Sequence, residues 1–469
     1  MKYFVFMVAS IGVLPLSVLL VLNERWMKYL FFGIAASICL FQSTSINFFS
    51  HEEYRGTAHG IEVSLVYLLA LALFIALALR GRFRGWEPDS GFRSSVVTLF
   101  ASIMLRRFWG WFPESGFRLY LIYFLLCLPS LTSACDDLIA WFELWKMMML
   151  YIVYLTTYTY LKASNDVKTI LWVLALLAIV NTVLVLLSHF GGIYQPRGFF
   201  PHRNGMAMAM QLLGNLCFAG YLTNGIKTLF GKICLLACGG AVLSTIWSYS
   251  RGALMILPFA YSITAIACLR EKKNTKQKRR RLLPILLVGV VIAAIALPRV
   301  IERFMHAPPK SGDTRVELAY CAREMIKDEP IRGVGINNWS LKMAPPYPYQ
   351  DNASAALGVE LNYTGIVETV YLLVGAECGI PALIAMIAWF GWYWVSCIRL
   401  LRRLKGTWWY FIPAGLLGGL TAQYMQSALE WVLRQQRNMI LLLLTFAVLS
   451  YLNTSWRKLT ATGTAGART

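Results

Sequence analysis

Long apolar segments recur along most of the chain, and they constrain its fold more than any other feature of the sequence. A helix needs about twenty predominantly apolar residues to cross the hydrocarbon core of a bilayer, and about thirteen segments approach that length. They are 3–22, 29–49, 61–79, 119–133, 138–161, 169–188, 205–223, 231–249, 252–269, 282–297, 369–398, 408–428 and 437–453. The composition agrees, since 58% of the 469 residues are hydrophobic and 14% are charged, unlike soluble domains. We therefore predict an all-α polytopic membrane protein with about 12–14 transmembrane helices.

Basic residues predict how these helices are oriented. Lysine and arginine number 44 against 23 acidic residues, which gives a formal net charge of +21. In a soluble protein this excess would suggest nucleic acid as a partner, but in a membrane protein the positive-inside rule explains most of it. The strongly basic loop 270–281 should face the cytoplasm. Alternation then places 162–168, 224–230 and 399–407 on the same side, and 189–204 and 298–367 on the outer side.

The region 80–118 does not fit this alternation. Its apolar core, 96–105, is short for a span and is surrounded by arginines, and the turn 85–93 recurs as 110–118 with the shared pattern Gly-Trp-x-Pro-acid-Ser-Gly-Phe-Arg. We interpret the region as an amphipathic segment in the membrane interface, anchored by two copies of one turn. If 94–109 crosses the membrane instead, the count becomes fourteen and the N-terminus moves to the cytoplasmic side.

The predicted division of the chain follows from these segments. N-terminal transmembrane helices occupy 1–133, and no small-residue cleavage signal follows the first of them, so we expect it to be retained. A transmembrane core occupies 134–297, an extracytoplasmic cap loop 298–367, C-terminal transmembrane helices 368–455 and a cytoplasmic tail 456–469.

The cap loop contains one predicted helix and one glycine-rich turn. Thr314 and Glu317 have the spacing of a capping box, so we expect a helix to begin there and to end by Glu329-Pro330. Gly333 and Gly335 permit turns that residues with a Cβ avoid, and they would leave backbone N–H groups open to a ligand. The alternative is a plain helix and turn without a binding role.

Four polar groups fall on the predicted outer side. They are Gln195–Asn204 with Arg197, His202, Arg203 and Asn204; Ser248–Gly252 with Ser250 and Arg251; the cap loop with Arg315 and Arg332; and Glu368 with Tyr371. Guanidinium groups bind phosphate oxygens bidentately and stay charged, so several of them beside a carboxylate suit a diphosphate ligand and a base. Each arginine taken singly fits equally well as an anchor to lipid headgroups. Glu430 and Arg434, four residues apart, are predicted to pair with each other.

The sequence predicts neither a metal nor another cofactor. Most of the ten cysteines lie within hydrophobic runs, and none has the paired C-x-x-C spacing of a metal site. We therefore expect no disulfide framework and no metal ligands.

Several of these motifs together resemble the O-antigen ligase and polymerase family. They are Arg197–Asn204, Ser250-Arg251-Gly252, Asp328–Gly335, and Tyr371-Leu372 followed by Glu377-Cys378-Gly379-Ile380, in the family's order. The resemblance implies a GT-C-like membrane glycosyltransferase that uses an undecaprenyl-diphosphate-linked glycan at the periplasmic side of a bacterial inner membrane. It also implies that Arg197 or Arg203, together with Arg251, holds the donor diphosphate, and that a glycan or lipid-linked glycan is the acceptor.

The chain departs from the family at one position. The ligases typically carry His-Asn before x-Tyr-Leu, and that histidine is thought to act on the acceptor hydroxyl, whereas Glu368 and Thr369 stand here. A carboxylate can also serve as a base, so transfer chemistry is retained. The departure favours a polymerase or another acceptor over a lipopolysaccharide ligase, with a chain-length regulator as a further partner.

We therefore expect a metal-independent glycosyltransferase of surface polysaccharide biosynthesis, whether O-antigen or exopolysaccharide. Glu368 and Arg251 are the expected catalytic residues. The expected substrate-binding residues are Arg197, His202, Arg203, Asn204, Ser250, Arg315, Arg332 and Tyr371. The alternatives are a secondary transporter of an anionic solute and an inactive assembly partner of a glycan export complex. Transporters often contain two matching halves, and the sequence shows a local repeat instead.

Overall fold

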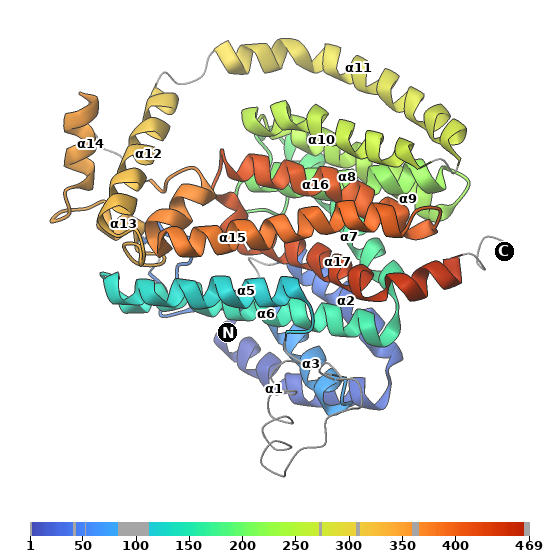
Figure 1. Cartoon of the computed structure of the whole chain (residues 1–469), viewed down its shortest axis with the longest axis horizontal. Coiled ribbons are helices and arrows are strands. Elements are labelled where there is room, and N and C mark those ends of the chain that lie inside the picture. Colours follow the sequence, from blue (N-terminus) through green and yellow to red (C-terminus); the bar gives the residue numbers. More distant parts are fainter. Residues whose placement is uncertain are drawn as a thin grey trace.

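Long helices lying side by side make up most of the protein. The computed structural model describes residues 2–40, 44–51, 53–82, 112–271, 274–305, 310–358 and 365–463. The long helices follow the long axis of the molecule, α12 to α14 gather at one end, and the last turns of the C-terminal helix α17 lie toward the other (Figure 1). Most of the predicted interfacial segment, including the first copy of its repeated turn, lies outside the described residues.

Each predicted apolar segment overlaps a helix. These helices are α1 (Lys2–Leu22), α2 (Arg25–Cys39), α3 (Leu65–Leu79), α5 (Ser115–Cys127), α6 (Asp137–Ser164), α7 (Val167–Phe190), α8 (Arg203–Asn224), α9 (Leu229–Trp247), α10 (Arg251–Arg270), α11 (Thr275–Met305), α15 (Val370–Arg403), α16 (Phe411–Ser427) and α17 (Gln436–Gly463). Short 3-10 helices are η1 (Leu128–Ser133), η2 (Trp408–Tyr410) and η3 (Val432–Arg434). Within the described residues, eight helical segments are long and apolar enough to cross a membrane. The predicted polytopic helical membrane protein is confirmed.

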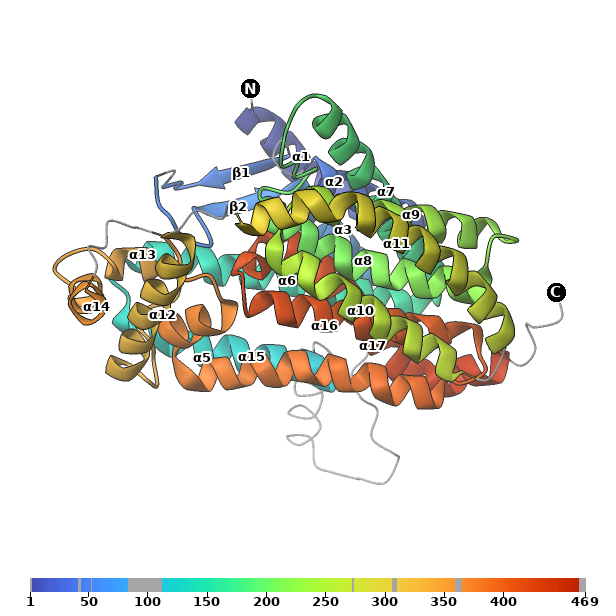
Figure 2. The same ribbon diagram turned by 90° about the horizontal axis from the view of Figure 1, so that it is seen from above.

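The predicted spans 29–49 and 61–79 are wrong at one end each, where the structure has strands instead of helix. The spans 29–49 and 61–79 end and begin in strands, β1 (Ser45–Phe48) and β2 (Ile61–Ser64), which pair antiparallel. Figure 2 shows this hairpin on the side of the bundle away from α15. Both segments alternate apolar with polar residues, the period-2 pattern of a strand with one buried face. Apolar content alone hid that alternation.

Helix α5 begins earlier than predicted, because the second copy of the repeated turn is partly helical. Glu114 precedes its first residue and is 9% exposed. The Glu114 carboxylate accepts hydrogen bonds from Ser450 Oγ at 2.7 Å and Trp392 Nε1 at 3.1 Å. This copy of the turn is therefore a structural anchor for α15 and α17, as a duplicated structural turn would be.

Helix α8 lies at the centre of the bundle and is packed by α9, α10 and α16. All of its most apolar window is buried. Small residues permit this, since close approach of helices in a membrane depends on Gly, Ala and Ser at the contact. A Cβ added at Gly415 of α16 would lie 2.7 Å from the backbone oxygen of Asn215 in α8.

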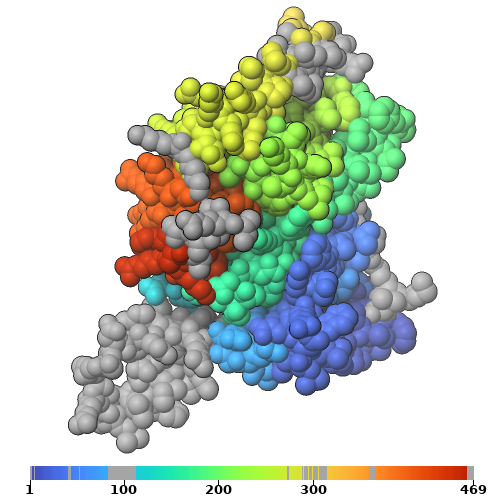
Figure 3. Space-filling model, turned by 90° about the vertical axis from the view of Figure 1, so that its right-hand side faces the viewer, coloured from blue at the N-terminus to red at the C-terminus, as the bar shows by residue number. Residues whose placement is uncertain are grey.

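The loops predicted to be cytoplasmic meet at one end of the bundle. Arg281 donates to the carbonyl of Leu222 at 2.7 Å, and the amide of Gly406 donates to Glu271 at 3.0 Å. Trp408 donates to Asn224 at 2.8 Å. This end, seen in Figure 3, is reached by segments from the N-terminal, central and C-terminal thirds of the chain. We call it the basic end, and the opposite end, where α12 to α14 lie, the cap end.

The grouping of these loops agrees with the predicted alternation, while the assignment of the basic end to the cytoplasm stays a prediction. A topology reporter fused near Lys276 should read cytoplasmic, and one fused near Gly312 should read extracytoplasmic, because α11 separates the two positions. Reporter activity from the same side at both positions would contradict this arrangement.

The cap differs from the prediction at its helix boundaries. Helix α11 continues past the predicted end of its span at 297 to Met305. Helix α12 (Lys310–Asp328) begins before Thr314, so the predicted capping box is wrong, although the helix ends before Pro330 as expected. Polar residues of the loop are compatible with a helix in water, and hydropathy marks the end of a membrane segment rather than the end of a helix. Two further helices, α13 (Trp339–Lys342) and α14 (Tyr349–Leu357), complete the cap.

Candidate functional site

Two of the predicted polar groups meet at the cap end. The rings of Tyr194 and Tyr249 stack with centroids 4.9 Å apart, which joins the loop before α8 to the break before α10. A Cβ at Gly252 would lie 2.8 Å from Leu429, in the segment between α16 and η3. Ser250 is buried at 3% exposure, and its amide donates to Ser248 Oγ at 3.1 Å. These contacts place Arg251, the first residue of α10, beside the segment that contains Glu430.

Arg315 of α12 joins two carboxylates there. Its Nε lies 2.7 Å and its Nη2 2.5 Å from Glu368 Oε2, and Nη2 lies 3.2 Å from Glu430 Oε1. Glu368 lies two residues before α15 begins at Val370, and Glu430 follows α16. Together with Arg203 and Asn204 at the start of α8, these residues form what we call the cap-end cluster. The structure thus brings together residues from all four predicted polar groups or their immediate neighbours.

The carboxyl group of Glu430 has a pKa that its surroundings in the cluster raise. Burial, followed by the nearby charge of Glu368, raises the pKa of Glu430 to about 7. A hydrogen bond from Asn204 and the positive charges of Arg315 and Arg203 oppose that shift. A group whose pKa lies near the working pH is suited to exchange a proton with a substrate.

His202 caps helix α8. Its Nδ1 accepts a hydrogen bond from the amide of Asn204 at 3.2 Å, which requires an unprotonated nitrogen. Partial desolvation and the charge of Arg203 lower the pKa of His202, so the neutral form that caps the helix is favoured. The structure therefore gives His202 a positioning role for Arg203 and Asn204.

Buried amides beneath the cluster tie three helices together, and the sequence analysis missed them. Gln426 of α16 donates to the carbonyl of Asn204 at 3.2 Å. Gln211 of α8 donates to Gln426 at 3.2 Å and to the carbonyl of Ala253 in α10 at 3.2 Å. Glutamine inside an apolar span was the signal that could have found them, since polar residues there pair with one another or mark functional sites.

Three predicted site residues lie outside the cluster. Arg332 pairs with Glu329 at 3.2 Å, close to the end of α12 away from Arg315. Tyr371 donates to the carbonyl of Tyr424 at 2.9 Å and so fastens α15 to α16. Arg197 donates to the carbonyl of Pro201 at 3.0 Å and lies at the surface of its loop.

The glycine-rich turn of the cap is docked against the helices rather than open to a ligand. Gly333 and Gly335 have φ of 74° and 118°, as the sequence predicts for such a turn. However, the amides of Val334 and Gly335 donate to the carbonyls of Ala376 and Glu377 at 2.8 and 3.1 Å. The backbone groups that the sequence suggested for a ligand therefore bind the kink of α15, where Gly379 has φ of 81°.

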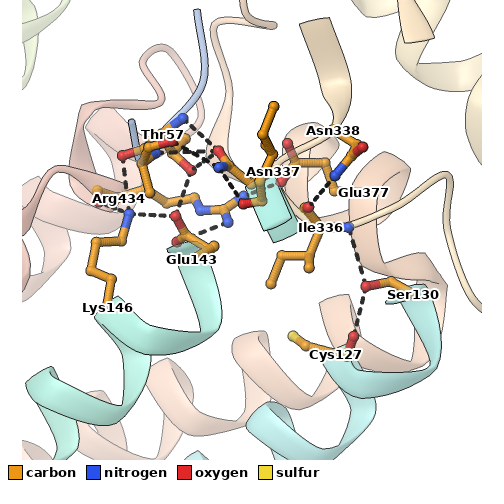
Figure 4. A network of polar contacts seen from close by, with 12 residues as sticks. Thr57, Cys127, Ser130, Glu143, Lys146, Ile336, Asn337, Asn338, Glu377 and Arg434 are labelled. Atoms are coloured by element: carbon orange, nitrogen blue, oxygen red, sulfur yellow. Dashed lines mark hydrogen bonds and ion pairs between the residues drawn. The ribbon is translucent and has the colours of Figure 1, made fainter. Parts of the chain in front are cut away.

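A buried ion-pair network lies behind this turn, and it replaces the predicted pair of Glu430 and Arg434. Arg434 contacts Glu143 at 2.9 Å and Glu377 at 2.5 Å, and Lys146 contacts Glu143 at 2.5 Å (Figure 4). All four side chains are at most 7% exposed. The prediction failed because Glu430 and Arg434 do not share a helix: a break and η3 separate α16 from α17.

The cap turn closes this network. Asn337 donates to the carbonyls of Ala58 and Ile139, both at 2.9 Å, and accepts from the amide of Thr57 at 2.8 Å. Thr57 Oγ1 in turn donates to Glu143 at 2.7 Å. The hairpin connection, α6, the cap turn, the α15 kink and η3 thus converge on one charge-balanced network, which we call the buried ion-pair network.

Fold and site define a multi-pass membrane protein with a charged site at one end of its helix bundle. Residues 234–387 match the family model described as O-antigen ligase. The match confirms the family resemblance over α9 to the first half of α15, about a third of the chain, and includes Arg251, Arg315 and Glu368. A comparison with curated proteins finds no significantly similar sequence.

Proposed function

We propose that this protein transfers a saccharide from a lipid-linked diphosphate to an acceptor hydroxyl at the cap end, which would face the periplasm of a bacterial inner membrane. The observation that supports this most directly is Arg315, which lies within 3.2 Å of the carboxylates of both Glu368 and Glu430. Proton-accepting and cationic groups next to one another are what a transfer with an anionic leaving group requires.

The proposed step can be written for this cluster. The acceptor hydroxyl oxygen forms a bond to the anomeric carbon while the bond from that carbon to the diphosphate oxygen breaks. The lipid diphosphate leaves with the electron pair, and the hydroxyl proton passes to Glu430. Arg251 and Arg203 would stabilise the charge on the leaving diphosphate, since guanidinium groups bind phosphate oxygens bidentately. Glu368 and Arg315 would orient the acceptor hydroxyl and Glu430.

An arginine substitution tests the donor half of this proposal. Arg251→Ala is expected to slow glycan transfer from a purified lipid-linked donor by about ten- to a hundredfold, the effect of losing about 1.5–3 kcal/mol of charged hydrogen bonding. Arg251→Lys should restore little of the rate, because an ammonium group lacks the planar fork.

Arg332→Ala is the matched control, since it removes an arginine that pairs with Glu329 away from the cluster. Both variants should insert and elute as the wild type does. An unchanged transfer rate in Arg251→Ala would show that Arg251 anchors the protein to headgroups, and the donor site would have to lie elsewhere.

A further inference from the structure

A polar cavity adjoins the cap-end cluster. Its volume is about 810 Å³, and its wall includes the β1–β2 hairpin, the start of α1 and the first turn of α17. Two of its lining residues are chain neighbours of cluster or capping residues: Pro201 precedes His202, and Trp431 follows Glu430. A third, Gln435, lies against Gly205, where an added Cβ would be 2.7 Å from its Oε1. The cavity and the cluster therefore share a wall.

The lining of this cavity has the chemistry that binds sugars. Side-chain amides of Asn47, Gln435 and Gln436 offer both donors and acceptors. The hydroxyl of Thr57, whose proton is donated to Glu143, keeps a lone pair that can accept. Trp431 supplies an aromatic surface for the C–H face of a pyranose ring. A site for an uncharged polyol needs these groups rather than a concentration of one charge.

The charged residues of the cavity are balanced and held in place. Arg437 is 4% exposed and interacts electrostatically with Glu62. Because these two opposite charges offset each other, the pair adds no net charge to the cavity. Glu62 is fixed by the hairpin, where it is the cross-strand partner of Asn47, and its carbonyl accepts from Trp145 at 3.0 Å. The volume of the cavity, about 810 Å³, lies within the range of about 300–1,000 Å³ that is typical of pockets for small ligands.

We infer that this cavity binds the terminal sugars of the acceptor glycan. The inference rests on the proposed transferase function, which requires a second saccharide close to the donor. The shared wall of Pro201, Trp431 and Gln435 places sugars in the cavity next to Glu430, where an acceptor hydroxyl would lose its proton. The β1–β2 hairpin would then determine which glycan is accepted.

Binding measurements on the full-length protein in detergent micelles test this inference. One probe is the oligosaccharide repeat unit released by mild acid from the surface polysaccharide of the producing cells, and the other is undecaprenyl diphosphate. Asn47→Trp places a large ring in the cavity from an exposed hairpin position. It should lower the affinity for the oligosaccharide by about tenfold or more, which corresponds to about 1.4 kcal/mol, and leave that for undecaprenyl diphosphate unchanged. Arg251→Ala should show the opposite pattern.

Two further variants make the result specific. Glu53→Trp adds the same ring at an exposed position of the same connection that does not line the cavity, and it should bind both probes as the wild type does. Ser50→Trp, a second filling substitution, should repeat the effect of Asn47→Trp. In transfer assays both filling variants should raise the acceptor KM and leave kcat nearly unchanged.

Wild-type oligosaccharide affinity in both filling variants, or no oligosaccharide binding by the wild-type protein, would overturn the inference. Failure of the proposed function has a different signature. In that case Arg251→Ala would keep its affinity for undecaprenyl diphosphate, whatever the filling variants do to the oligosaccharide.

Discussion

Replacing Arg434 by methionine is expected to lower the free energy of unfolding by about 3–5 kcal/mol, the cost of removing one partner from a buried ion pair. Arg434 is the group that contacts both Glu143 and Glu377, and its own side chain is 7% exposed. Without it, Glu377 would be buried at 2% exposure without the cation that it contacts at 2.5 Å. Unfolding by denaturant in detergent micelles measures the change.

A second substitution tests whether the unpaired charge is the cause. In Arg434→Met, Glu143 keeps its contact with Lys146 at 2.5 Å, so one positive and one negative charge remain paired. Adding Glu377→Gln removes the other buried negative charge and should recover part of the lost stability. A double variant that is less stable than Arg434→Met would contradict this account.

The matched control is Arg332→Met, which removes an arginine from an exposed pair with Glu329. Exposed pairs contribute about 0–1 kcal/mol, so the control should unfold nearly as the wild type does. A loss in the control equal to that in Arg434→Met would mean that removal of any cap-end arginine destabilises the protein, and burial of the pair would not be the reason.

The sequence predicted the helices well because a membrane span has a strong local signal. Apolar length and the distribution of lysine and arginine are properties of single segments and their flanks. The β1–β2 hairpin was missed because Ser45–Phe48 and Ile61–Ser64 are short and adjoin apolar helices. The start of α12 was missed because a capping box at Thr314 is a local preference that the helix overrides.

The site was predictable in its residues and not in its pairings. Arginines and a carboxylate at polar breaks could be recognised one by one, and Arg315, Glu368 and Arg203 do come together. The contacts of Arg434 could not be predicted from the spacing of residues along one helix, because they join distant parts of the chain. Lys146, for example, donates to the backbone carbonyl of Arg434 although 288 residues separate the two. Ionisable residues inside the apolar helix α6 were the available signal, since charges there are costly without partners.

Glu430→Gln is expected to slow glycan transfer by about 10²- to 10⁴-fold, the range for loss of a general base. Glu430 is the candidate base because its pKa is raised to about 7, first by burial and then by Glu368. A base acts in its ionised form, so the wild-type rate should rise as the pH increases through about 7 and level off above it. Initial rates with a purified lipid-linked donor, measured over that range, should show this limb, and Glu430→Gln should lose it.

The two charged neighbours of Glu430, Glu368 and Arg315, should shift its pH profile in opposite directions when each is neutralised. Glu368→Gln removes the negative charge that raises the pKa of Glu430, so its activity limb should move to lower pH. Arg315→Gln removes a positive charge that lowers the same pKa, so its limb should move to higher pH. Glu324→Gln, which breaks an exposed pair with Lys327 on the same helix as Arg315, should leave both rate and limb unchanged. If Glu430→Gln retained the wild-type rate and limb, Glu430 would serve only to hold Arg315, and the proton acceptor would have to be Glu368.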